Sequence, residues 1–132
     1  MANEKARLKD KKIVIYKQTK AGGWNDKAEF MPIYDPAEIP KLWAYFKQLS
    51  GDIFYASATT NTKEECFFRI AWTDRLNKQR PQDYYLDYNG TLYQLTRIDP
   101  YEGYKRDLAL YCKLATTTLS AVTIVDFDPE KL

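Results

Sequence analysis

Hydrophobic and polar residues alternate in two short runs on either side of an Asn-Gly dipeptide. The runs are YYLDY (84–88) and TLYQL (91–95), joined by Asn89 and Gly90. A type I′ turn needs positive φ at both central residues, and Asn-Gly is the dipeptide that best tolerates it. The pattern therefore predicts a β-hairpin in which these residues face each other: Tyr88 and Thr91, Leu86 and Tyr93, Tyr84 and Leu95.

The predicted hairpin would carry one mainly apolar face. Because side chains alternate across a strand, Tyr84, Leu86, Tyr88, Tyr93 and Leu95 would share that face. A sheet with an inner face committed to burial is typical of a small closed or sandwiched β-structure.

Four further runs have strand character. They cover residues 12–18, 65–72, 107–114 and the β-branched stretch 122–125. Alternation within two of them predicts two more inward-facing sets: Cys66, Phe68, Ile70 and Trp72 in one, and Leu108, Leu110, Cys112 and Leu114 in the other.

The segment 36–51 (PAEIPKLWAYFKQLSG) fits two structures. Leu42, Phe46 and Leu49 have helical spacing, whereas the alternation of large and small residues from Leu42 fits a strand equally well. Periodicity alone does not decide between them. Before it, Gly22-Gly23 predicts a turn, and the proline-containing stretch 24–39 predicts a long loop with short extended pieces.

These elements predict a mainly β fold: a small antiparallel β-barrel or sandwich of about six to seven strands, with at most one or two short helices. We expect a flexible N-terminal arm at 1–11, the β domain at 12–114 and a C-terminal extension at 115–132. A chain of 132 residues with 45% hydrophobic residues is long enough for one such domain.

One segment does not resemble a core element. Residues 50–62 (SGDIFYASATTNT) are small and hydroxyl-rich, with Asp52 as the sole charge. Such a loop forms a poor core and suits contact with a partner or projection into a cavity. Its polar and small residues are Ser50, Gly51, Asp52, Ser57, Thr59, Thr60, Asn61 and Thr62.

Composition weighs against an enzyme. The chain has no histidine, so Ser–His and Cys–His pairs and histidine zinc sites are excluded. No glycine-rich phosphate loop occurs, and Cys66 and Cys112 are expected to be buried thiols. The carboxylate pairs Glu64/Glu65 and Asp83/Asp87 are best interpreted as solvated charges. We expect no catalytic residue, no cofactor and no metal.

Charge identifies no partner. The net charge of +2 is too small to indicate nucleic acid or a membrane. The N-terminus lacks an apolar signal region and no apolar run approaches about 18 residues, which predicts a soluble, cytoplasmically made protein. Tyr101 and Tyr104 beside Lys105 and Arg106 fit base stacking, but a turn packed by tyrosine is favoured.

The order of features over residues 7–114 resembles the phage head–tail joining proteins, also called head-completion or stopper proteins. The matching features are the basic segment running into the strand at 7–16, Trp43-Ala44, Ser50-Gly51-Asp52 with Ala56, the approach from Thr62 to Ile70, and Asn89-Gly90 with Tyr93, followed by Arg106. Two departures are Asp52, where the pattern more often has Glu, and the extension 115–132.

This resemblance implies a non-enzymatic virion protein whose copies form a ring between the portal side of the head and the tail. A loop in the ring's channel would retain DNA, and we assign it to 50–62 by similarity. Partners would be portal or adaptor proteins, tail proteins and weakly contacted DNA, with no membrane. Trp24, Trp43, Tyr101 and Tyr104 are candidate subunit contacts. The alternatives are a tail-terminator or tail-completion ring protein and a single-stranded nucleic-acid-binding barrel.

Overall fold

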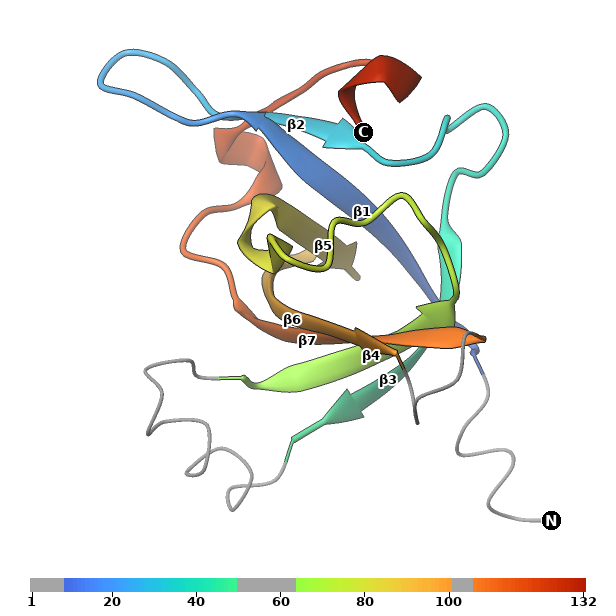
Figure 1. Cartoon of the computed structure of the whole chain (residues 1–132). Helices are drawn as coiled ribbons and strands as arrows, with labels where there is room; N and C mark the ends of the chain where they lie inside the picture. Colours follow the sequence, from blue (N-terminus) through green and yellow to red (C-terminus); the bar gives the residue numbers. More distant parts are fainter. Residues whose placement is uncertain (1–8, 50–63, 101–105) are drawn as a thin grey trace, which may run out of the picture.

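The protein is an all-β barrel in the computed structural model, which describes residues 9–49, 64–100 and 106–132 (Figure 1). The predicted fold class is confirmed. In the described part of the chain, helical structure is limited to three-residue 3₁₀ turns, and no helix is long and apolar enough to cross a membrane. The strands are β1 (Lys11–Lys20), β2 (Glu29–Pro32), β3 (Leu42–Gln48), β4 (Cys66–Ala71), β5 (Tyr84–Tyr88), β6 (Thr91–Pro100), β7 (Asp107–Leu114) and β8 (Thr123–Ile124).

Six antiparallel strands close on themselves. Their order is β3-β4-β7-β6-β5-β1, and β1 pairs back onto β3 to complete the circle. The closing register places Lys12 opposite Trp43 and Ile13 opposite Leu42. Closure removes the free edges of these strands, so the fold is a barrel rather than a sandwich.

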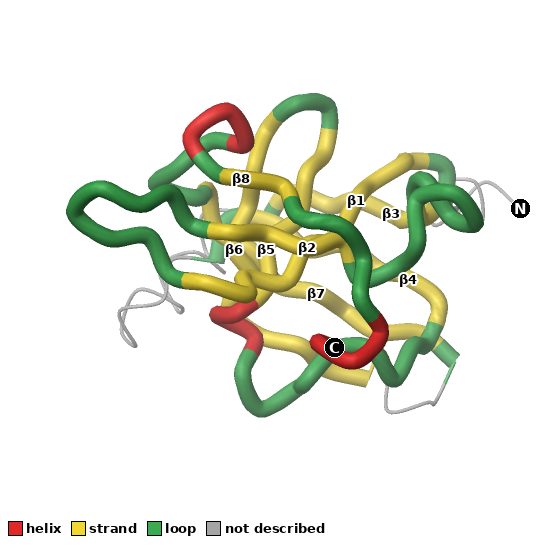
Figure 2. Tube along the Cα trace, turned by 90° about the horizontal axis from the view of Figure 1, so that it is seen from above, coloured by secondary structure: helices red, strands yellow, loops and turns green. Residues whose placement is uncertain are grey.

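Strand β1 continues beyond the closing contact and carries a small extra sheet. Its C-terminal half pairs with β2, and β8 adds to β2 in parallel (Figure 2). Val122, next to β8, is buried in a second apolar cluster with Phe30 and Leu92. The segment 115–132 therefore packs partly against β2 of its own barrel.

The β5–β6 hairpin has the predicted turn and register. Asn89 has φ 52° and Gly90 φ 82°, the left-handed region that a type I′ turn requires. Tyr88 pairs with Thr91 and Leu86 with Tyr93. All five residues of the predicted inner face belong to the core cluster or pack against it.

Phe68 on β4 lies at the centre of the core. Its ring centroid is 5.0 Å from Phe46, 5.5 Å from Tyr88 and 5.8 Å from Tyr93, and its side chain is fully buried. Such aromatic contacts stabilise the fold by about 0.5–1.5 kcal/mol each beyond the free energy gained from burying apolar area.

The main cluster of buried residues draws on every strand of the barrel. It consists of Ile13, Ile15, Ile33, Ala44, Cys66, Phe68, Ile70, Leu76, Tyr84, Leu86, Leu95, Ile98, Leu108, Leu110 and Cys112.

The prediction of buried thiols is confirmed. Cys66 on β4 lies opposite Cys112 on β7, and both are buried and free.

The prediction of alternating inward-facing residues in β7 is wrong at the end of the strand. Leu114, predicted to face inward, is 53% exposed because it is the last residue of β7, where the chain leaves the barrel wall.

The ambiguous segment at 36–49 contains a strand. Ala44 is fully buried and Phe46 packs on the core, whereas the neighbouring Trp43 is 55% exposed. This alternation is the period of a strand. A helix here would leave the facing edges of β1 and β4 without hydrogen-bond partners, so barrel closure selects the strand.

Gly90→Ala should destabilise the protein by about 1–2 kcal/mol, because a Cβ is unfavourable at a φ of 82°. Gly23→Ala is the matched control, since a Cβ there meets no atom within 4 Å and the residue has no positive φ. We expect its free energy of unfolding to stay within about 0.5 kcal/mol of wild type. Urea unfolding measures both variants; equal losses would contradict the turn assignment.

Candidate functional site

The segment 50–62 leaves and re-enters the barrel at adjacent points. Gln48 at the end of β3 pairs with Cys66 at the start of β4, and the Leu49 N–H donates to the Glu65 carbonyl at 3.0 Å. The Glu65 N–H in turn donates to the Cys112 carbonyl at 2.8 Å. The candidate channel-loop residues themselves, Ser50 to Thr62, lie outside the described residues. Their attachment is a hydrogen-bonded pair of strand ends.

Glu64 anchors the returning strand. It is 7% exposed, and its carboxylate accepts from Thr96 Oγ1 at 3.4 Å and from Arg97 Nη2 at 3.3 Å. We expected a solvated charge at this position, and that prediction is wrong. Its partners lie more than thirty residues away in sequence, so no local pattern could have revealed them.

The two members of each candidate carboxylate pair have different partners. Glu65 Oε2 accepts from the Leu114 N–H at 3.0 Å, while Glu64 binds Arg97. Asp83 pairs with Arg80 at 2.8 Å. The pKa of Asp87 is raised above its ordinary value by burial, and the nearby charge of Lys41 offsets only part of that rise.

Both free thiols are buried. Burial raises the pKa of the Cys112 thiol well above its ordinary value, with contributions from Cys66 and Glu64, so it stays protonated and a poor nucleophile. Within residues 9–49, 64–100 and 106–132, no three His, Cys, Asp or Glu residues gather as a metal site.

An aromatic row crosses the outer face of the barrel on β3, β4 and β7. The Tyr45 and Phe67 ring centroids are 6.0 Å apart, and those of Phe67 and Tyr111 are 5.5 Å apart. The Arg69 guanidinium lies 5.2 Å from the Tyr45 ring centroid and that of Arg97 lies 3.9 Å from Tyr111. Sequence analysis missed this row because it depends on the register between strands far apart in the chain.

The two arginines that stack on this row, and the neighbouring Lys9, have carboxylate partners. Lys9 and Arg69 both pair with Asp107, at 2.7 and 3.6 Å, and Arg97 pairs with Glu64 and Asp99, each at 3.3 Å. A phosphate backbone would have to compete with these carboxylates. Phosphate binding by Arg69 or Arg97 would therefore disturb an existing ion pair.

Two of the four candidate subunit contacts can be located. Trp24 lies in the loop 21–28 between β1 and β2 and is 97% exposed. Trp43 lies on the outer face of β3, with Lys12 Nζ 4.8 Å from its ring centroid. Tyr101 and Tyr104 lie outside the described residues. The structure does not bring Trp24 and Trp43 together, because the loop and the start of β3 lie at opposite ends of β1 (Figure 1).

A groove of about 260 Å³ adjoins Trp43, and we call it the Trp43 groove. It is lined by residues of β3, of β4 and the position just after it, of the segment before β3, and of the stretch before β1. These residues are Lys9, Tyr34, Ile39, Lys41, Leu42, Trp43, Ile70, Ala71 and Trp72.

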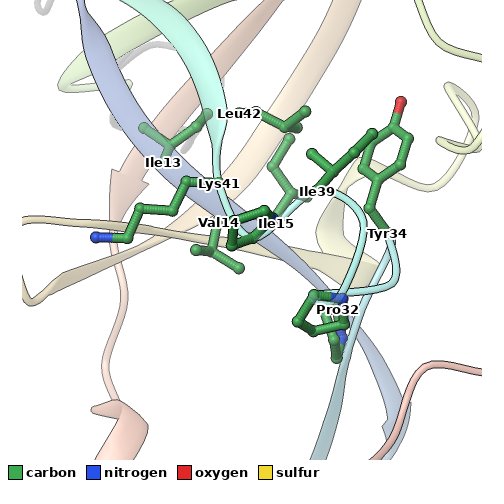
Figure 3. A pocket seen from close by; sticks show the side chains of 10 residues that line it. Ile13, Val14, Ile15, Pro32, Tyr34, Ile39, Lys41 and Leu42 are labelled. Carbon is green, nitrogen blue, oxygen red and sulfur yellow. The ribbon is translucent and has the colours of Figure 1, made fainter.

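A second cavity nearby is much smaller. It measures about 20 Å³ and lies between β1 and the segment 32–42 (Figure 3). Ile13, Ile15 and Leu42 line it, while the Lys41 ammonium points away (Figure 3). This volume holds about one water molecule, so it is no small-molecule site.

Comparison with family models gives a match over residues 6–115, to the family described as phage head completion protein. The chain belongs to this family. The match ends just after β7 and so takes in all six strands that close the barrel. Membership assigns the chain a structural role in head completion, as a virion component at the head–tail junction that meets other virion proteins. A comparison with curated proteins found no match.

Glu64→Ala should destabilise the protein by about 1–2 kcal/mol, because it removes the buried carboxylate that binds Arg97, while Thr96 keeps the Tyr111 carbonyl as its acceptor. Asp99→Ala is the matched control, since Asp99 also binds Arg97 but is 46% exposed, and should cost less than about 0.5 kcal/mol. Chemical denaturation of both variants gives the comparison; a larger loss for Asp99→Ala would refute the anchoring role.

Proposed function

We propose that this head completion protein acts as a connector: its copies form a ring between the portal side of the head and the tail, extending the DNA channel without catalysing a reaction. The observation that carries the proposal is the family match over the whole closed barrel. A rigid barrel with closed edges suits a ring subunit, because its contacts with neighbours can be confined to chosen surfaces.

We further propose that the segment 50–62 enters the channel and retains the packaged DNA. Its attachment supports this, because the flanking residues Leu49 and Glu65 are hydrogen-bonded and the returning strand is anchored by Glu64. Its composition also supports it. Each Lys or Arg contact to phosphate adds salt-dependent affinity for DNA. The segment 50–62 contains no Lys or Arg, which suits a plug that must later release the DNA.

Single-strand binding is the less favoured function, because the family match supports a connector and the two arginines that stack on the aromatic row, Arg69 and Arg97, are paired with carboxylates. We expect the purified protein to bind single-stranded DNA weakly. A salt titration of binding measures this directly. Tight binding that falls steeply with salt would favour the nucleic-acid-binding alternative over the connector.

Disruption of the gene should leave packaged heads that lose their DNA, together with separate, complete tails. Electron microscopy of the particles and nuclease sensitivity of the packaged DNA measure the two effects. A tail-terminator role would instead give heads that keep their DNA and tails of abnormal length. Intact tailed particles would contradict both roles.

Deleting residues 52–61 should preserve the barrel and leave the assembled heads leaky. Replacing the same residues with a glycine-serine segment of equal length separates the effect of loop sequence from that of loop length. Thermal unfolding of the purified variants monitors the fold, and nuclease sensitivity of the packaged DNA monitors retention. Loss of the fold on deletion would show that the segment is part of the core instead.

A further inference from the structure

The C-terminal extension lies on the outside of the barrel and closes an edge of the sheet. Beyond residue 115, β8 adds to β2 in parallel (Figure 2). The Thr123 N–H donates to the Ala28 carbonyl at 2.8 Å, and the Val125 N–H donates to the Phe30 carbonyl at 2.9 Å. Without these two donors, both carbonyls would lie on an open strand edge, which is a template for pairing with another chain.

The extension also covers an apolar patch on the outer wall. Val122 is 8% exposed and packs in one cluster with the buried side chains of Phe30 and Leu92. The Tyr85 ring stacks on Phe30 with the two centroids 4.5 Å apart, and Tyr16 packs on the same cluster. Removing Val122 from this cluster would therefore expose aromatic and aliphatic surface directly beside the β2 edge, and such patches favour association.

The extension is held less firmly than the barrel wall. Within 116–132, a range that the structure describes throughout, Val122 is the one buried side chain, whereas β4 alone buries every second one of its six residues. The further contacts of the extension join exposed or half-buried groups, as in the hydrogen bond from Lys17 Nζ to the Lys131 carbonyl at 2.9 Å. Little burial offsets the cost of ordering this segment, so it can open locally while the barrel stays folded.

We propose that the extension is a releasable strap, which keeps the β2 edge closed and prevents copies of the unassembled chain from pairing through it. The family match ends at residue 115, so the strap lies outside the part shared with the family. While it is tethered, the strap outcompetes other chains because its effective concentration is high. Once it is released, a second copy is the expected occupant, because each open copy presents the same unpaired edge and apolar patch. The strap does not depend on the proposed connector function.

Hydrogen exchange of the full chain, followed by NMR, tests whether the strap opens by itself. The amides of Thr123 and Val125 should be protected on the order of 100-fold less than those of Phe68 and Leu110, because they need only local opening. Phe68 and Leu110 pair across β4 and β7, so their amides report on opening of the barrel. Equal protection would show that the extension opens only together with the barrel, and would overturn the proposal.

Releasing the strap should produce self-association of the full chain. Val122→Asp places a charge in the buried cluster, and the variant should associate at least roughly tenfold more tightly than wild type. Ile124→Asp is the matched control, because Ile124 is 47% exposed on the same short strand, and it should leave association unchanged. Sedimentation over a concentration series measures both variants. A Val122→Asp protein that associates no more than wild type, or no more than Ile124→Asp, would refute the strap.

A synthetic peptide of residues 116–132 separates release of the strap from general misfolding. It should bind the Val122→Asp chain and reverse its association, because it restores the Val122 side chain and the donors at the β2 edge. The same peptide carrying Val122→Asp should do neither. The native peptide should bind wild type far more weakly, because the tethered strap occupies the site. Association that the native peptide does not reverse would overturn the proposal, while defective particles on gene disruption would leave the connector role standing.

Discussion

The pairing of β1 with β3 is the contact on which the rest of the structure depends. It involves the residue pairs Lys11–Ala44, Lys12–Trp43 and Ile13–Leu42, and it turns an open sheet into a closed barrel. Without it, both β1 and β3 would expose an unpaired edge, the feature that most exposes a sheet to aggregation. It also brings Ile13, which pairs with Leu42, into the same core cluster as Ala44, so closure and burial of apolar area reinforce each other.

Closure also fixes the positions of Trp43 and Trp24, the two candidate subunit contacts that the structure describes. Trp43 faces outward because Ala44 faces inward, and the groove beside it exists because β3 lies against β1 and β4. The same strand β1 then runs to the opposite end of the molecule and leads into the loop that carries Trp24. One long strand therefore separates Trp24 and Trp43, the two candidate subunit contacts that the structure describes.

The chemistry of the outer face indicates a structural role. Its arginines stack on Tyr45 and Tyr111 and are held by carboxylates, so these charges link neighbouring strands of the barrel wall. Glu64 contributes to this wall at the point where the segment 50–62 returns. This arrangement agrees with membership of the head completion family.

The sequence by itself determined the hairpin, the inward-facing residues of β4 and most of those of β7, the buried thiols and the all-β class. These features depend on neighbours in the chain: Asn89-Gly90 fixes a turn and a period of two fixes a face. It also carried the ordered features that resemble the family. Only the tertiary structure decided that 42–48 is a strand, that Glu64 is buried against Arg97, and that Trp43 borders a groove. Each of these depends on residues brought together across the barrel, where register and closure, rather than local periodicity, set the environment.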